Sequence, residues 1–481
     1  MNLAMVRYLL GWMLGVEAAF LLLPMLTALV YGESTGFAYL FAALICLFFA
    51  LLLSMRKPKN TRFYAREGFV TVALCWIVLA LTGALPLHFS GEIPFYLDAV
   101  FETISGFTTT GATILGNVEA LSHASLLWRS LTHWLGGMGV LVFILAILPL
   151  AGGHTIYLMR AESPGPAVSK LSPHLRDTAM ILYGIYIGLT ALEIVLLAIG
   201  GMPLFDSVNV ALSTAGTGGF GMWNDSIAHY NSYYLQGVIS VFMILFGVNF
   251  SLYFLMLTRK WKQALKSEEL RLYLGVIALS TLLIGFNVRA SFDNIFQSLH
   301  HALFQVASII TTTGFATADF DLWPAFSKAI LVLLMFIGAC AGSTGGGIKC
   351  SRILLMLKSV KKELHYLIHP RSIRINQMDN HRIAHEIVRS INVFLIAYLL
   401  IFISSFLLLS LNGEDMVTNF TAVAATLNNV GPGLVGVGPT CNFGFFPPIS
   451  KLVLMFDMLA GRLELFPMLL LFTPATWRKN R

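Results

Sequence analysis

The sequence predicts an all-α polytopic membrane protein: ten transmembrane helices, in which an N-terminal pair precedes four pseudo-four-fold helix–pore-loop–helix repeats. Three observations support this fold class. Of the 481 residues, 57% are hydrophobic and only 11% charged, whereas about 25% of an ordinary soluble protein is charged. Ten apolar stretches approach the length that crosses a bilayer, and a Gly-containing loop recurs four times. This composition excludes a soluble enzyme, because one core could not bury so much apolar surface.

The expected membrane crossings follow from the apolar stretches, because a transmembrane helix needs about 20 mostly apolar residues. The stretches are 8–30, 37–55, 68–88, 125–150, 178–200, 235–257, 272–288, 327–357, 388–411 and 449–472. The first has spanning length and no small-residue cleavage site follows it, so we expect a membrane anchor rather than a cleaved signal peptide.

Lys and Arg are concentrated in alternate connections. The connections 55–67, 151–177, 258–271 and 349–390, together with the two termini, hold 26 of the 31 basic residues, and the opposite loops hold twelve acids. Basic loops stay on the cytoplasmic side, so both termini are predicted to be cytoplasmic. The net charge of +7 is therefore an orientation signal. A basic face for nucleic acid is not indicated.

Four connections on the acidic side are too long for turns, and each contains an apolar piece too short to span. They are 89–124, 201–234, 290–326 and 412–448. Each piece runs into a Thr- or Asn-rich loop with Gly, as expected of a re-entrant half-helix. Irregular backbone at membrane depth is tolerated only where protein buries it or where it lines a watery cavity.

These loops are copies of one another. The segments that end at Gly111 and Gly314 share Ala, Phe, Ser and a closing Thr-Thr-Thr-Gly at matching positions. A third copy ends at Gly219 and keeps the six-residue interval from Ser, and the fourth, at Gly431, is the most divergent. Regular recurrence defines the repeat units. The units are an N-terminal helix pair at 1–67 and pore repeats at 68–177, 178–270, 271–387 and 388–481.

Four such loops around one axis would form a filter for a monovalent cation. Backbone carbonyls can replace the hydration shell of the ion without adding fixed charge, and Gly permits the required backbone angles. The candidate filter residues are Thr109, Thr110, Gly111, Thr217, Gly218, Gly219, Thr312, Thr313, Gly314, Asn429, Val430 and Gly431. In the second repeat both Gly218 and Gly219 remain candidates. The alternative is that the loops are small-residue packing turns.

Six motifs together resemble the Trk/Ktr/HKT superfamily of potassium uptake proteins, and within it the bacterial TrkH/TrkG subunits. The motifs are Thr108-Thr-Thr-Gly111-Ala-Thr113, Trp128-Arg-Ser-Leu-Thr-His-Trp134-Leu-Gly136-Gly-Met-Gly139, Thr311-Thr-Thr-Gly314-Phe315, Gly342-Ser-Thr-Gly-Gly-Gly347-Ile-Lys349, Asn428-Asn-Val-Gly-Pro-Gly433 and Met458-Leu-Ala-Gly-Arg462-Leu-Glu464. The resemblance implies a channel-like potassium translocator in the bacterial inner membrane, with K⁺ at the filter residues and Rb⁺ as a second cargo. In the family, Gly at all four filter positions accompanies potassium conduction, and Ser in the first repeat accompanies sodium preference.

The resemblance also implies partners. A homodimer is expected, together with a cytoplasmic TrkA-like ring that binds NAD or ATP. The basic connection 349–390 is the expected docking surface. No cofactor and no structural metal are expected in this chain itself.

A Gly-rich break in the eighth expected span indicates a gate. Several Gly residues in succession disfavour a helix by about 1 kcal/mol each, and the resemblance identifies the break as an intramembrane gating loop. The candidate gate residues are Gly342, Ser343, Thr344, Gly345, Gly346, Gly347, Lys349 and Arg462. Arg462 lies near the middle of the last expected span, where an Arg costs at least ~2.5–3.5 kcal/mol. It is either an electrostatic barrier facing the ion path or an anchor for helix-end carbonyls.

Two other functions are considered. The acids Glu17, Glu193, Asp457 and Glu464 in or near spans raise a proton- or sodium-coupled symporter as the alternative to a channel. An enzyme of the zinc-hydrolase class would need a catalytic motif such as HExxH, and the sequence contains none. The pairs His365/His369 and His381/His385 have helical spacing but lie in the basic connection, which favours surface histidines over a metal site.

Overall fold

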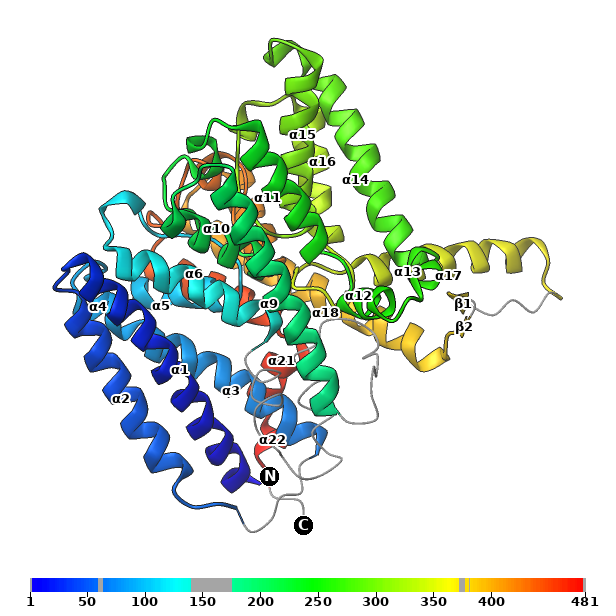
Figure 1. Ribbon diagram of the computed structural model, residues 1–481. Helices are drawn as coiled ribbons and strands as arrows, with labels where there is room; N and C mark the ends of the chain where they lie inside the picture. Colours follow the sequence, from blue (N-terminus) through cyan, green and yellow to red (C-terminus); the bar gives the residue numbers. More distant parts are fainter. Residues whose placement is uncertain (1, 59–63, 140–174, 372–376, 380, 479–481) are drawn as a thin grey trace.

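The computed structural model describes residues 2–58, 64–139, 175–371, 377–379 and 381–478. Most of these residues are helical (Figure 1). The strands in these ranges are the two short pieces β1 (Gln377–Met378) and β2 (His381–Arg382), which pair antiparallel. The fold is therefore the mostly helical one that the composition predicts.

Six helices in the described part are long and apolar enough to cross a membrane. They are α1 (Leu3–Tyr31), α2 (Gly36–Ser54), α3 (Ala65–Gly83) continued by α4 (Leu85–Phe89), α9 (Leu175–Ile199), α14 (Glu268–Asn287) and α18 (His385–Leu409). They coincide with the first, second, third, fifth, seventh and ninth expected spans. The N-terminal pair and the first helix of every repeat are thus long helices.

The second helix of each repeat is shorter than expected. These helices are α6 (His123–Met138), α11 (Tyr233–Phe246), α16 (Ala325–Ile337) and α20 (Pro448–Arg462). The expected uninterrupted spans 235–257 and 449–472 are therefore wrong in this respect, whereas the break expected within 327–357 is present. The expected span 125–150 is described only as far as Gly139, and its remainder lies outside the described residues.

Local backbone explains where these helices end. After α11 the chain bends by 93° into α12 (Phe250–Leu257), whose first turn is capped by the Asn249 side chain. After α16, Gly338 adopts φ 70°, and after α20 both Glu464 and Leu465 have positive φ. A right-handed helix cannot continue through such residues.

Between the two helices of each repeat lies a short helix. These are α5 (Tyr96–Phe107), α10 (Leu204–Gly216), α15 (Ile295–Ile310) and α19 (Met416–Leu427). The side chains of Asn294 and Asp415 cap the starts of α15 and α19, as is usual at helix N-termini. Each helix is followed at once by one of the Gly loops, which matches the expected half-helices.

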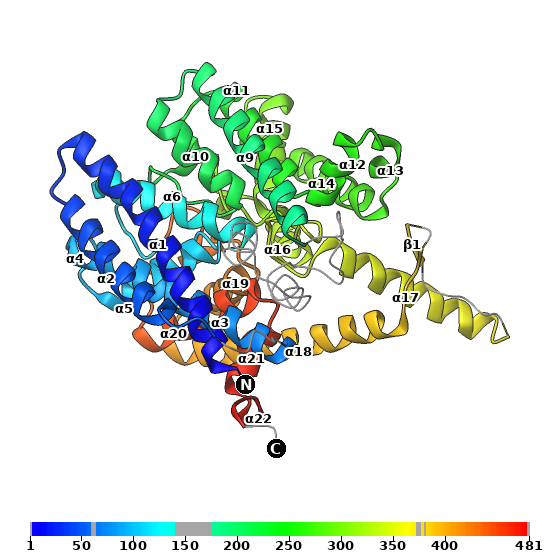
Figure 2. The ribbon, with the colours of Figure 1, turned by 60° about the horizontal axis from the view of Figure 1, so that its bottom comes forward.

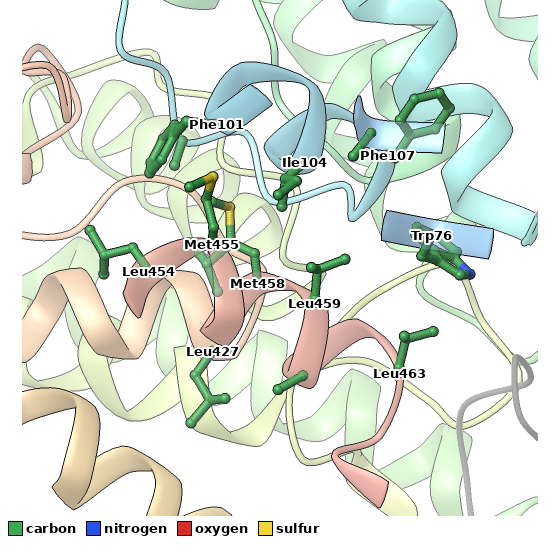
Figure 3. Close-up of a cluster of buried hydrophobic side chains, with 14 of the residues drawn as sticks. Trp76, Phe101, Ile104, Phe107, Leu427, Leu454, Met455, Met458, Leu459 and Leu463 are labelled. Atoms are coloured by element: carbon green, nitrogen blue, oxygen red, sulfur yellow. The ribbon is translucent and has the colours of Figure 1, made fainter. Parts of the chain in front are cut away.

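A hydrophobic cluster joins the first repeat to the last (Figure 3). It contains Trp76 from α3, Phe101, Ile104 and Phe107 from α5, Leu427 from α19, and Leu454, Met455, Met458, Leu459 and Leu463 in or just after α20. The two ends of the repeat array therefore pack together, far apart though they are in sequence.

The N-terminal pair lies at one side of the molecule, with α1 and α2 next to each other in both views (Figures 1 and 2). The turn between them reaches the first repeat. Glu33 accepts hydrogen bonds from the backbone N–H groups of His123 (2.8 Å) and Ala124 (3.3 Å), at the start of α6. A carboxylate at a helix N-terminus satisfies free N–H groups and favours the helix dipole.

On another side, α17 (Cys350–Ile368) and the start of α18 project from the rest of the chain (Figure 2). In its described part, the basic connection 349–390 is mainly helix α17, followed by the β1–β2 hairpin and the start of α18. The remaining short helices of the described ranges are α13 (Trp261–Leu265), α21 (Phe466–Phe472), α22 (Pro474–Trp477) and 3₁₀ turns at Val118–Ala120, Ser226–His229, Arg289–Ser291, Phe320–Leu322, Ser410–Asn412 and Val435–Val437.

Candidate ion pathway

The four loops after the short helices have the same backbone conformation. In each, a non-Gly residue with φ between 54° and 59° is followed two positions later by a Gly with φ between 79° and 97°. The first set is Thr109, Thr217, Thr312 and Asn429, and the second is Gly111, Gly219, Gly314 and Gly431. Positive φ is strained for a β-branched residue, and such strain gathers at functional sites.

One hydrogen bond also recurs in all four loops, from the residue between these two back to the preceding helix. The donor N–H and acceptor carbonyl are Thr110 to Ser105 (2.9 Å), Gly218 to Ser213 (2.9 Å), Thr313 to Ser308 (2.8 Å) and Val430 to Ala425 (2.8 Å). This bond closes the C-terminus of the helix, as in a Schellman motif. It identifies Gly219, not Gly218, as the equivalent of Gly111.

The four loops form a closed ring. A Cβ added to any of the four glycines would come too close to a carbonyl oxygen of the next loop. The glycine–carbonyl pairs are Gly111 with Gly218, Gly219 with Thr313, Gly314 with Val430, and Gly431 with Thr110. The fourth loop thus returns to the first, and all twelve candidate filter residues are brought into this ring. Only Gly permits both the φ values and the close approach.

A cavity of about 330 Å³ lies on one side of the ring, the side on which the chain continues after each ring glycine. All four ring glycines line it, together with Arg129, Phe220, Pro432 and other residues of the outer loops. The cavity gives the ring an open approach from this side.

A buried ion pair supports the wall of this cavity. Arg129 Nε lies 2.9 Å from Glu102 Oε1, and both side chains are almost fully buried. Glu102 also accepts from Thr113 Oγ1 (2.9 Å) and the N–H of Ile114 (3.0 Å), while Arg129 donates to the Gly221 carbonyl (3.2 Å). The pair therefore connects the chain after the first ring glycine to the chain after the second. The sequence interpretation missed it, because Glu102 was counted as an acid of an outer loop.

The Gly-rich segment of the third repeat lies on the other side of the ring. The break in the helix is wider than expected, from Gly338 to Lys349. The N–H of Gly346 donates to Thr312 Oγ1 (2.6 Å), and the N–H of Gly347 donates to the Asn428 carbonyl (3.1 Å). The candidate gate loop thus contacts the third and fourth filter loops directly. Lys349 is buried, and its Nζ donates to the Gly345 carbonyl within the loop itself.

Arg462 is the last residue of α20, directly before the break that separates α20 from α21. Its guanidinium donates to the helix-end carbonyls of Gly136 (2.5 Å) and Gly137 (2.6 Å), to the Thr344 carbonyl (2.8 Å) and to Thr109 Oγ1 (3.2 Å). These bonds match the carbonyl-anchor alternative. They also place the charge between the candidate gate loop and the first filter loop.

The nearby acids have other partners. Glu464 pairs with Arg352 at the start of α17, and Asp457 accepts from Ser405 Oγ (2.7 Å). Glu269, which sequence reasoning missed, is buried at the start of α14. Its Oε1 accepts from the N–H groups of Ala341 (2.7 Å) and Ser351 (3.0 Å), near the two ends of the gate loop. One carboxylate oxygen thus holds the loop at both ends, and a Glu-Glu pair opening an apolar helix is its only sequence signal.

Comparisons with known proteins identify the family of this chain. A family model described as "TrkH: Cation transport protein" matches residues 35–479. The chain is 38% identical over 488 residues to the Trk system potassium uptake protein TrkH of Salmonella typhimurium, with both chains covered fully. It is 34% identical to the Trk system potassium uptake protein TrkG of Escherichia coli, with 99% of each covered.

A solved structure is also similar. The crystal structure of the potassium transporter TrkH from Vibrio parahaemolyticus matches with a TM-score of 0.90 and 33% identity, over 99% of this chain and 100% of that one. The chain belongs to the TrkH family of cation transport proteins, which are transporters rather than enzymes.

Proposed function

We propose that this chain takes up K⁺ through the ring made by its four loops, and that Rb⁺ passes by the same route. The observation that carries the proposal is the closure of the ring, with four equivalent glycines packed against the carbonyls of four neighbours. Carbonyl oxygens from the loops would replace the hydration shell of the ion. The relatives named above as potassium uptake proteins support K⁺ as the cargo.

The proposed architecture has ten crossings in the bacterial inner membrane, with both termini cytoplasmic. Six crossings are the long helices, and four are the shorter second helices of the repeats. The distribution of 26 of 31 basic residues on one side supports this orientation. The membrane potential would then drive K⁺ inward, at about 2.3 kcal/mol per charge per 100 mV.

The proposed gate is the segment 338–349, together with Arg462. Two observations support this role. The segment contacts the ring on the side away from the cavity, and Arg462 and Glu269 form hydrogen bonds with the segment. An ion leaving the ring on this side would meet the loop. Shortening Gly342–Gly347 is expected to raise ion flux and to leave the preference among ions unchanged.

The proposed partners are a second copy of the chain and a cytoplasmic TrkA-like ring. The nucleotide, NAD or ATP, would bind to the TrkA-like ring and not to this chain. The projecting helix α17 carries Lys358, Lys361 and Lys362 and is the proposed docking surface for the TrkA-like partner. Nucleotide control would then reach the gate through α17, which begins directly after the gate loop.

A proton- or sodium-coupled symporter is the second candidate, because Glu17, Glu193 and Asp457 are buried in the apolar interior. Glu17 accepts from Thr82 Oγ1 (2.6 Å), between the N-terminal pair and α3. Among the hydrogen bonds of the described residues, none joins these three carboxylates to a ring loop. This arrangement favours uncoupled passage.

The deciding experiment is radioactive rubidium flux through the purified chain in liposomes, with potassium and sodium as competitors. We expect rapid flux that potassium suppresses, that sodium does not, and that a pH gradient leaves unchanged. Flux that requires a proton or sodium gradient would establish the symporter instead. Sodium passing as well as potassium would contradict the potassium filter.

A further inference from the structure

The second filter loop lacks a side chain that the other three loops have. The position directly before each ring glycine is Thr110, Thr313 or Val430 in repeats one, three and four, and these side chains are fully buried. In repeat two the same position is Gly218, as its hydrogen bond to the Ser213 carbonyl shows. A space behind the second loop must therefore be filled by something else.

The imidazole ring of His133 fills it. A Cβ added to Gly218 would collide with three atoms of that ring, Cγ, Nδ1 and Cδ2. His133 belongs to α6, the second helix of repeat one, and is fully buried. A side chain from repeat one therefore occupies the volume that repeat two leaves empty.

The imidazole of His133 contacts residues on both sides of the second filter loop. Its Nδ1 lies 3.3 Å from the hydroxyl of Ser213, before the loop. It stacks on Phe220, directly after Gly219, with ring centroids 4.2 Å apart and planes inclined by 23°. The backbone of α6 is equally close, because a Cβ at Gly216 would collide with the His133 carbonyl.

We infer that His133 is a positioning residue for ion selectivity: it fixes the carbonyls of the second filter loop in place of the missing side chain at Gly218. Packed interiors transmit small changes in volume to their neighbours, so a void here lets the second loop relax. This inference rests on the proposed filter. It means that a residue of repeat one supports the filter loop of repeat two.

The test uses three variants of the full chain in liposomes, compared by the ratio of rubidium to sodium flux. His133→Ala should lower the ratio about tenfold, which corresponds to ~1.4 kcal/mol between the two ions. Gly218→Thr alone should disturb the loop, because its side chain collides with the imidazole. The double variant His133→Ala with Gly218→Thr should return the ratio to within about twofold of wild type, because contacting residues couple energetically.

A matched control is Leu131→Ala, which removes a buried side chain from the same helix but from a direction about 200° away. It should keep the wild-type ratio. The inference is wrong if His133→Ala also keeps it, or if the double variant is no better than His133→Ala. A double variant that does not assemble, judged by size-exclusion chromatography, also counts against it. A wild type without preference for rubidium would instead contradict the proposed filter.

Discussion

Arg462 donates a hydrogen bond to Thr109 across 353 residues of sequence, and the same guanidinium reaches Thr344 in the gate loop. The end of the last repeat is therefore bonded to the first filter loop and to the proposed gate at once. Glu464, two residues later, is paired with Arg352 at the start of α17.

Replacing Arg462 by Ala is expected to raise rubidium flux, because the Thr344 carbonyl of the gate loop loses the hydrogen bond that it accepts from Arg462. Arg462→Lys should raise flux nearly as much, since an ammonium group cannot reproduce the planar fork that reaches several carbonyls. Liposome flux under a fixed potential measures both. If Lys behaves like wild type, charge alone matters and Arg462 is an electrostatic barrier.

Gly111→Ser is expected to lower the ratio of rubidium to sodium flux. The added Cβ would collide with the Gly218 carbonyl, so the backbone of the ring must move. In addition, Gly111 has φ 79°, a backbone angle that is strained for Ser. Gly116→Ser is the matched control, because nothing lies within 4 Å of a Cβ there. Equal ratios for the two variants would show that the ring is not the filter.

Glu269→Ala is expected to raise flux without changing the selectivity ratio, because the gate loop loses the acceptor at both of its ends. The control is Glu268→Ala, whose carboxylate binds Lys358 and the N–H of Asp379 outside the loop. Flux and selectivity are measured together in liposomes. A parallel loss of selectivity would mean that Glu269 supports the filter rather than the gate.

Glu102→Gln is expected to destabilise the protein by ~3–5 kcal/mol, because Arg129 keeps a buried charge without its partner. Glu268→Gln is the comparison. Glu268 pairs with Lys358, and their side chains are 27% and 28% exposed; such partly exposed pairs contribute only about 0–1 kcal/mol. Thermal unfolding in detergent ranks the two variants. Similar losses would contradict the burial argument.

Much of this arrangement could be predicted, because it depends on short sequence motifs and on local hydropathy. The positions of Gly111, Gly314 and Gly431 followed from the repeated motif. The interval from Ser213 favoured Gly219, which the backbone angles support. The long first helices of the repeats were also predictable, since hydropathy alone defines them.

Other features depend on tertiary contacts that no window of sequence contains. Hydropathy averages over the bend at Asn249 and over the positive φ of Leu465, so the second helices of repeats two and four are predicted to be continuous. Helix α17 begins within the expected span 327–357 but continues to Ile368, beyond the apolar stretch that hydropathy detects. Glu102 and His133 were missed for a different reason: their partners are on other segments, and only the fold brings them together.

The closure of the ring within one polypeptide has a genetic consequence. In an assembly of four identical chains, one codon change alters every quadrant, and no quadrant can differ from the others. Here each quadrant is encoded separately, so one wall of the pathway can change while three stay as they were. Gly218 beside His133 is an instance: one repeat has no side chain at this position, and a residue of the neighbouring repeat fills the space.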